Sequence, residues 1–369
     1  MRSTGALIAF AALTLPPVHA ALPDGLSVPP GFKIALYADH VDTARELALG
    51  SNGTVFAGSR SAGKVYALTD ADGDGRAERV RTIASGLREP TGIAFRNGDL
   101  YIGAVNRIVV LRDIEHHLDA PPKPELVTDK LPDEGSHGWK FLAFGPDGRL
   151  YVPVGAPCNI CVPDKDHAKL LSMRIDGSDW RDEAFGIRNT VGFDWQPGSG
   201  ALWFTDNGRD MLGDDLPSDE LNRISTRGEH FGFPYCHQGD MLDVELGKDK
   251  SCKDYTPPVL TLGAHVAAIG MRFYTGTAFP AEYRGAAIVA EHGSWNRSRK
   301  SGYRVMAVEL DGAKVKNYTP LIDGFKDGET ALGRPADVLV MPDGALLVAD
   351  DLAGAVYRLT YSPTAARKE

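Results

Sequence analysis

The chain has 369 residues, a formal net charge of −9 and 43% hydrophobic residues. The negative balance argues against a nucleic-acid partner, because such a partner favours a basic surface. A chain of this length exceeds the usual size of one compact core, so it must either divide into domains or repeat a structural unit.

The N-terminal residues have the three parts of a secretory signal peptide. Arg2 gives a positive start, an apolar run covers residues 6–15, and small residues at 18–20 offer a cleavage site. We therefore expect residues 1–20 to be removed and residues 21–369 to be exported, to the periplasm or outside the cell. The run is shorter than the roughly 20 residues that span a bilayer, so we expect no stable membrane insertion. An uncleaved anchor or a frayed terminus is the alternative.

One pattern recurs along the chain: a short apolar strand, a turn that contains glycine, and a second short apolar strand. The six copies cover residues 47–58, 92–103, 141–152, 191–204, 271–289 and 337–348. Asn52-Gly53 and Asn97-Gly98 are typical of these turns, because such pairs supply the positive φ angles that hairpins need. A further apolar segment often follows, as at residues 64–68, 304–308 and 355–359.

Three or four strands per repeat, with turn glycines about 50 residues apart in the first four copies, is typical of propeller blades. A single hairpin cannot bury its apolar face alone, so the copies must pack on one another around an axis. The pattern predicts an all-β fold, a six-bladed β-propeller over residues 21–369. Two stacked β-sandwiches are the alternative, but they would not explain the regular period.

A long polar stretch at about residues 206–263 interrupts the repeat, and such inserts on a rigid scaffold often carry functional residues. It contains two of the four cysteines, Cys236 and Cys252; the others are Cys158 and Cys161. An even number of cysteines in an exported protein favours disulfides, and we expect the local pairs 158–161 and 236–252. Val162 follows the second cysteine of the C-x-x-C, so this is not a haem-attachment motif. The wide separation of the cysteines disfavours zinc.

A candidate calcium loop lies between the first two copies. Asp70, Asp72 and Asp74 alternate along it, and glycine follows each of the last two. This is the front half of a calcium-binding loop, but Arg81 stands where the closing glutamate of a helix–loop–helix site would be. A charged hairpin loop without metal is the alternative.

Cationic residues precede three of the hairpins at matching positions. His137, Arg188 and Arg334 each lie a few residues before a copy, and loops at equivalent positions in different blades converge on one face of a propeller. An imidazole there could act as a general base, and guanidinium groups bind carboxylates. Taken singly, a salt bridge between blades is the alternative for each arginine.

These pieces together resemble the PQQ-dependent glucose/sorbosone dehydrogenase family, especially its aldose, pyranose and L-sorbosone dehydrogenase-like branch. The resemblance covers roughly residues 22–361. It is carried by the order and spacing of GSHGWKFLAFGPDGRLYVPVGAPCN, FGIRNTVGFDW, TDNGRD, SDELNRI, EHGSWNRS and GRPADV.

The resemblance implies a role for each matching position. His137 matches the base that takes the proton of the sugar hydroxyl. The positions that match cofactor-binding residues are Arg188, Asn189, Asn207, Trp295 and Arg334. The positions that match metal ligands are Gly208 and Arg209, through backbone carbonyls, and Glu220 in a structural calcium site. Val191 and Ala336 depart from the glucose dehydrogenases, which have Gln and Arg there, so the match does not extend to glucose specificity.

The implied function is oxidation of a sugar with PQQ and Ca²⁺ as cofactors, by hydride transfer to the quinone. The cofactor would bring the redox chemistry and the protein would supply position and charge. Without a haem motif, electrons must leave to a separate acceptor, a quinone or a cytochrome. A calcium-dependent lactonase or hydrolase on the same fold and a non-catalytic binding propeller are the alternatives, because propellers have many functions.

Overall fold

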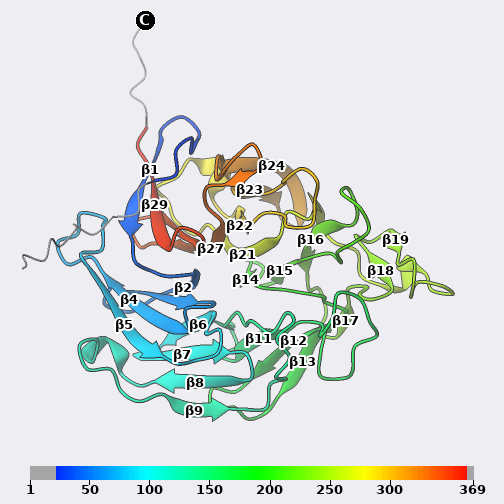
Figure 1. The fold of residues 1–369 in the computed structure, drawn as a ribbon, viewed down its shortest axis with the longest axis horizontal. Helices are drawn as coiled ribbons and strands as arrows, with labels where there is room; N and C mark the ends of the chain where they lie inside the picture. The colour runs from blue at the N-terminus through cyan, green and yellow to red at the C-terminus, as the bar shows by residue number, and fades with distance from the viewer. Residues whose placement is uncertain (1–21, 364–369) are drawn as a thin grey trace, which may run out of the picture.

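The computed structural model describes residues 22–363, whose regular structure is almost all antiparallel β-sheet (Figure 1). Within this range, six sheets of four or five strands are arranged in a ring, which confirms the predicted six-bladed β-propeller. The predicted signal peptide, residues 1–20, lies outside the described residues. Among the residues described, no helix is long and apolar enough to cross a membrane.

The first four blades follow one another along the chain. Blade 1 comprises β2 (Ala44–Leu49), β3 (Val55–Ser59), β4 (Lys64–Thr69) and β5 (Arg79–Ser85). Blade 2 comprises β6 (Gly92–Arg96), β7 (Asp99–Ala104), β8 (Arg107–Leu111), the 3-10 helix η1 (Ile114–His116) and β9 (Glu125–Thr128). Blade 3 comprises β10 (Ala143–Phe144), β11 (Leu150–Val154), β12 (Lys169–Met173), β13 (Arg181–Phe185) and, parallel at its edge, β17 (Glu229–His230). Blade 4 comprises β14 (Phe193–Trp195), β15 (Leu202–Asp206), β16 (Ser218–Arg223) and β20 (Leu260–Ala264).

The last two blades complete the ring. Blade 5 comprises β21 (Ala268–Phe273), η3 (Ala281–Tyr283), β22 (Ala287–Glu291), β23 (Arg304–Asp311) and β24 (Lys314–Ile322). Blade 6 comprises β27 (Pro335–Val340), β28 (Leu346–Asp350), β29 (Ala355–Tyr361) and β1 (Phe32–Ala38). Smaller elements outside the blades are β18 (Cys236–His237), β19 (Met241–Leu242), η2 (Cys252–Asp254), β25 (Lys326–Asp327) and β26 (Thr330–Ala331).

Each predicted glycine turn joins the first two strands of a blade. In blade 2, Asn97 and Gly98 connect β6 to β7 with φ angles of 53° and 88°. Two consecutive positive φ angles define the tight turn whose twist matches that of the flanking strands, so this dipeptide fixes the hairpin register. The polar stretch at 206–263 is less of an insert than the sequence predicts, because it also supplies β16 and β20 to blade 4 and β17 to blade 3.

The ring closes by pairing the two ends of the described chain. β1 lies antiparallel to β29, with Phe32 opposite Tyr361 and Ile34 opposite Leu359 (Figure 1). The N-terminal strand thus becomes the outer strand of the C-terminal blade. The pairing covers the outer edge of β29, completes blade 6 with a fourth strand and joins the two ends of the ring.

Apolar side chains on both faces of a blade are buried against its two neighbours. Phe193, at the start of blade 4, lies with its ring centroid 5.0 Å from that of Phe141 beside blade 3. From the same blade, Trp203 lies 6.0 Å from Phe273 of blade 5. Burying one such side chain contributes about 1.5–3 kcal/mol, and a blade obtains that contribution only between two neighbours.

Buried charges connect the innermost strands around the axis. Glu46 of β2 accepts hydrogen bonds from the backbone N–H groups of Ile93 and Leu142, both at 2.9 Å, and so joins blade 1 to blades 2 and 3. Arg272 of β21 lies 3.3 Å from Glu46 and 3.6 Å from Asp337 of β27. Although burial works against it, the surrounding carboxylates raise the pKa of Arg272, so the guanidinium stays charged.

Removal of the Glu46 carboxylate should destabilise the whole ring. Glu46→Ala leaves two buried N–H groups without an acceptor and Arg272 without one of its partners. We expect the free energy of unfolding, measured by urea titration, to fall by about 3–5 kcal/mol. The matched change Glu282→Ala, at an exposed position, should cost no more than about 0.5 kcal/mol. Equal effects of the two substitutions would contradict this role.

Candidate functional site

The loops at one end of the propeller enclose a cavity of about 290 Å³. Its lining comes from blades 1, 3, 4, 5 and 6, at the starts of innermost strands and the ends of the strands that follow them. Seven of the residues predicted for a site from the sequence lie together here: His137, Arg188, Asn189, Asn207, Gly208, Trp295 and Arg334. Arg209 and Glu220 lie beside the cavity, and Asp70, Asp72 and Asp74 lie elsewhere.

His137 is held in an unusual backbone conformation that turns its ring into the cavity. Its φ is 47°, in the left-handed region that non-glycine residues seldom adopt. A Cβ at Gly155 would lie 2.5 Å from the His137 Cβ, so the facing strand end needs glycine. His137 Nδ1 lies 2.8 Å from the Ala156 carbonyl oxygen, to which it must donate a proton. The neutral ring therefore presents the lone pair of Nε2.

The environment keeps this imidazole neutral. Burial, followed by the positive charge of Arg188, lowers the pKa of His137 to about 4, although its bond to Ala156 acts in the opposite direction. Trp139 packs edge-on against the ring, with centroids 5.9 Å apart. At neutral pH, His137 is a proton acceptor rather than a cation.

Hydrogen bonds of both the backbone and the side chain hold Arg188 and Asn189 in place. Their N–H groups donate to the two oxygens of buried Asp206, at 2.9 and 2.6 Å. The Asn189 Oδ1 accepts from the indole N–H of Trp139 at 3.2 Å. The Arg188 guanidinium already donates to Asn159 and to the Asp210 carboxylate, so it gives the cavity a positive charge and few free donors.

The segment 207–209 offers oxygen atoms to one side of the cavity. The Gly208 N–H donates to Asp219 at 2.9 Å. Among the described residues, no hydrogen bond reaches the carbonyl oxygen of Gly208 or Arg209. The Arg209 side chain is buried and turned away, where it pairs with Asp243 at 2.6 Å and Glu245 at 2.8 Å.

Buried carboxyl groups gather next to this segment. Burial raises the pKa of Asp206 to about 6 and that of Asp219 to about 7. Burial and repulsion by Asp206 raise the pKa of Glu220 to about 8. Glu220 accepts hydrogen bonds from the Asn222 amide and the Gln238 N–H, at 2.9 and 2.7 Å. Raised pKa values of this kind mean that burial disfavours the ionised form of these carboxyl groups.

Arg334 and Trp295 line the opposite part of the cavity. Arg334 Nε donates to the His292 carbonyl at 3.1 Å and Nη2 to the Gly293 carbonyl at 2.6 Å. Within the described chain these bonds use two of the five guanidinium N–H groups, so the rest can bind a ligand. Trp295 is 66% exposed although it is large and apolar, and it leaves a flat face open at the cavity.

The structure adds a buried group that the sequence analysis missed. The Asp351 carboxylate lies 2.8 Å from Arg45 and 2.9 Å from Nε2 of His292, and both partners line the cavity. Although burial raises it, the two partners hold the pKa of Asp351 below its usual range. Arg45 lies two residues before the first hairpin copy, so the rule that selected Arg188 and Arg334 could also have found it. Arg60, another missed residue of the lining, lies over the Trp139 ring at 4.7 Å.

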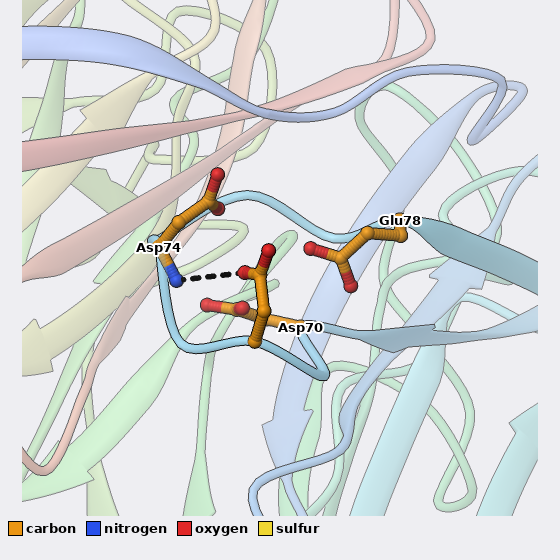
Figure 2. Close-up of side chains that lie close together, drawn as sticks. Asp70, Asp74 and Glu78 are labelled. Atoms are coloured by element: carbon orange, nitrogen blue, oxygen red, sulfur yellow. Dashed lines mark hydrogen bonds between the residues drawn. The ribbon is translucent and has the colours of Figure 1, made fainter.

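The candidate calcium loop connects β4 to β5, outside the cavity (Figure 2). Oxygens of Asp70, Asp72, Asp74 and Glu78 all lie within 4.8 Å of one another, so Glu78 joins the three residues selected from the sequence. Backbone N–H groups of the loop also bind these carboxylates, as Gly73 and Gly75 bind Asp70. The calcium site in this loop stays a prediction.

Both predicted disulfides are present. Cys158 is bonded to Cys161 and Cys236 to Cys252, which confirms the local pairing. The first closes a short loop that carries Asn159, the partner of Arg188.

Comparison with known proteins places this chain among sequence and structural relatives. The model of the TrAA12-like family matches residues 176–362. An uncharacterized protein of Borreliella burgdorferi is 32% identical over 351 residues, which cover 91% of each chain.

Solved structures with the same fold are more distant in sequence. A carbohydrate-active enzyme of family AA12 from Trichoderma reesei has a TM-score of 0.80 at 18% identity, over 95% of this chain and 100% of that one. The PQQ domain of pyranose dehydrogenase from Coprinopsis cinerea has a TM-score of 0.76 at 17% identity, over 91% and 97%. The PQQ-bound aldose sugar dehydrogenase of Streptomyces coelicolor has a TM-score of 0.65 at 18% identity, over 91% and 100%.

Burial of His292 should make stability depend on pH. Burial lowers the pKa of His292 from 6.5 to about 4. Asp351 raises this pKa, whereas the positive charges of Arg45 and Arg334 lower it further. Between these values the unfolded chain binds more protons, so the stabilisation is complete above 6.5 and is lost as the pH falls towards 4. In urea titrations of the ligand-free protein, His292→Gln should reduce the pH slope of the unfolding free energy by up to about 1.4 kcal/mol per pH unit. The same slope in both proteins would contradict the neutral, buried state.

Proposed function

We propose, from the premise that this chain belongs to the TrAA12-like family, that it is an exported oxidoreductase that oxidises a sugar with PQQ and calcium. The observation that carries the proposal is the meeting of a neutral imidazole and ligand-free guanidinium donors in one cavity. The solved relatives named above include a PQQ-bound aldose sugar dehydrogenase and a holo PQQ domain of a pyranose dehydrogenase. We chose PQQ as the proposed cofactor because these two relatives bind it.

The cavity fits a flat, negatively charged quinone. Four arginines line it, Arg45, Arg60, Arg188 and Arg334, against two carboxyl residues, Asp210 and Asp219. PQQ carries three carboxylates, and guanidinium groups bind carboxylates through paired donors. Arg334 would hold one of them with its unused N–H groups. Trp295 and Trp139 offer aromatic faces to the ring system.

The segment 207–209 fits calcium. Within the described chain the carbonyl oxygens of Gly208 and Arg209 accept no hydrogen bond, and oxygen is the ligand that calcium takes. The buried carboxyl groups of Asp206, Asp219 and Glu220 lie next to it with raised pKa values. A divalent cation beside them would favour their ionised forms and so lower these pKa values. Gly208 and Arg209 would therefore hold the metal through their carbonyls, and Glu220 would contribute charge from behind or hold a second, structural ion.

His137 would act as the general base. Its Nδ1 proton is fixed on the Ala156 carbonyl, so Nε2 is the atom that can accept the proton of a sugar hydroxyl. When bound, the quinone supplies an acceptor for the hydride that leaves the sugar carbon bearing this hydroxyl. Arg188 opposes a positive charge on His137, which keeps the base ready but raises the cost of the protonated state. The proton must therefore pass on to solvent or a second group before the next turnover.

The proposed function also includes a substrate class, an electron acceptor and a cellular location. The substrate would be an aldose, a pyranose or a sorbosone-like aldehyde or lactol, and electrons would pass to a separate quinone or cytochrome. The signal peptide predicted for residues 1–20 supports export to the periplasm or to the medium.

Loss of the base should stop turnover without loss of cofactor. In protein loaded with PQQ and calcium, His137→Ala should lower kcat by roughly 10²–10⁴-fold, because proton removal then falls to water. Affinity for PQQ should change by less than about threefold, since the contacts of Arg334 remain. Dye-coupled sugar oxidation and PQQ titration measure the two quantities. Turnover equal to that of the unaltered protein would eliminate His137 as the base.

Loss of the Arg334 guanidinium should instead weaken cofactor binding. Arg334→Ala removes a charge-assisted contact worth about 1.5–3 kcal/mol, so the Kd for PQQ should rise by roughly 10–100-fold. Quenching of tryptophan fluorescence during PQQ titration, with calcium present, gives the Kd. Arg284→Ala, at an exposed position outside the cavity, is the matched control and should leave it unchanged. Equal Kd values for both variants would contradict the assignment.

A further inference from the structure

The segment Asn207–Asp210 is held by side chains from several separate parts of the chain. The Asn207 amide donates to the Ala268 carbonyl, and the Gly208 N–H donates to Asp219. These contacts come from blades 4 and 5 and hold the first half of the segment. The second half, Arg209 and Asp210, is held by two loops that are each closed by a disulfide, one between β11 and β12 of blade 3 and one between β17 and β20.

The first of these loops is the four-residue ring from Cys158 to Cys161. Within it, Asn159 binds the backbone of Asp210 twice: its Oδ1 accepts from the Asp210 N–H at 2.7 Å and its Nδ2 donates to the Asp210 carbonyl at 3.0 Å. The same Oδ1 accepts from Arg188 Nη2 at 2.8 Å, and the Asn159 carbonyl accepts from Arg188 Nε at 2.9 Å. One side chain therefore fixes both the segment and the arginine of the cavity.

The second loop runs from Cys236 to Cys252 and includes β18 and β19, outside the ring of blades (Figure 1). Its Asp243 is fully buried and pairs with Arg209 at 2.6 Å and with His237 at 2.9 Å. The loop's own N–H groups at Glu245 and Leu246 donate to the other oxygen of Asp243, at 2.9 and 2.8 Å. The Arg209 side chain is thereby anchored on the side away from the cavity.

We propose that these two disulfide-closed loops form a clamp that preorganises the carbonyls of Gly208 and Arg209 for calcium, with Asn159 and Asp243 as positioning residues. Backbone carbonyls carry no net charge, so each is a weak ligand for calcium. A site made of them binds calcium well only if the carbonyls are held in place before the metal binds. The Asn159 side chain bonds both the N–H and the carbonyl of Asp210, as the backbone of a neighbouring β-strand would do. The proposal rests on the calcium site of the proposed function and adds to it how that site is built.

The proposal is tested by measuring calcium affinity by calorimetry. Calcium chloride is titrated into the full-length protein without PQQ. All proteins carry Asp70→Asn and Asp74→Asn, so that the loop between β4 and β5 contributes no binding. Asn159→Ala should weaken calcium affinity about tenfold or more, and Cys158→Ser with Cys161→Ser should weaken it as well. Asn159→Asp keeps the oxygen that accepts from Asp210 and Arg188 but loses the bond that Nδ2 donates to the Asp210 carbonyl, so its calcium affinity should lie between those of Asn159→Ala and the parent.

The control separates positioning from general stability. Gln196→Ala removes partly buried side-chain bonds to Gly312 and Ser199 at the opposite end of blade 4. It should lower the Tm of the calcium-free protein as Asn159→Ala does, yet leave calcium affinity unchanged. Equal affinity in Asn159→Ala and the parent would overturn the clamp and leave the calcium site standing. Absence of calcium binding in the parent itself would overturn both the clamp and the calcium part of the proposed function.

Discussion

Burial of both faces of every blade between two neighbours is the constraint on which this structure depends. No blade can satisfy it alone, so the ring must close, and β1 closes it by pairing with β29. Closure brings the innermost strands together around the axis, where buried backbone groups need partners. Glu46 supplies such a partner to two other blades at once, and Arg272 compensates its charge. The rigid ring then leaves the loops at one end free to carry chemistry.

The cavity has a consistent electrostatic design. Arginines dominate one part of it and buried acidic groups lie beside another, and the neutral imidazole of His137 lies near the positive charge of Arg188. An anion and a divalent cation that bind side by side would satisfy both parts. A hydrolase on the same fold would need the metal but would leave the guanidinium donors of Arg334 without a ligand. The cationic part of the lining is therefore what favours a carboxylated cofactor over hydrolysis.

Much of the fold and part of the site follow from local sequence patterns. The Asn-Gly and Asp-Gly turns determine hairpins locally, so the blades could be found one at a time. His137, Arg188 and Arg334 could be selected because each precedes a hairpin and the fold brings such positions together. Arg45 also precedes a hairpin, but its ion pair with Asp351 could not be predicted, because ring closure alone brings these two ends of the chain into contact. The partner of Arg209 was equally hidden, since it depends on how the loop closed by Cys236 and Cys252 folds.

Reduction by a sugar of a quinone bound in this cavity is the reaction proposed for this protein. The most direct measurement is the absorbance spectrum of protein loaded with PQQ and calcium, recorded without oxygen while a panel of aldoses is added. We expect at least one sugar to convert the bound quinone to its reduced form, with one sugar oxidised per cofactor. Failure of the protein to take up the quinone, or an unchanged spectrum with every sugar, would contradict it.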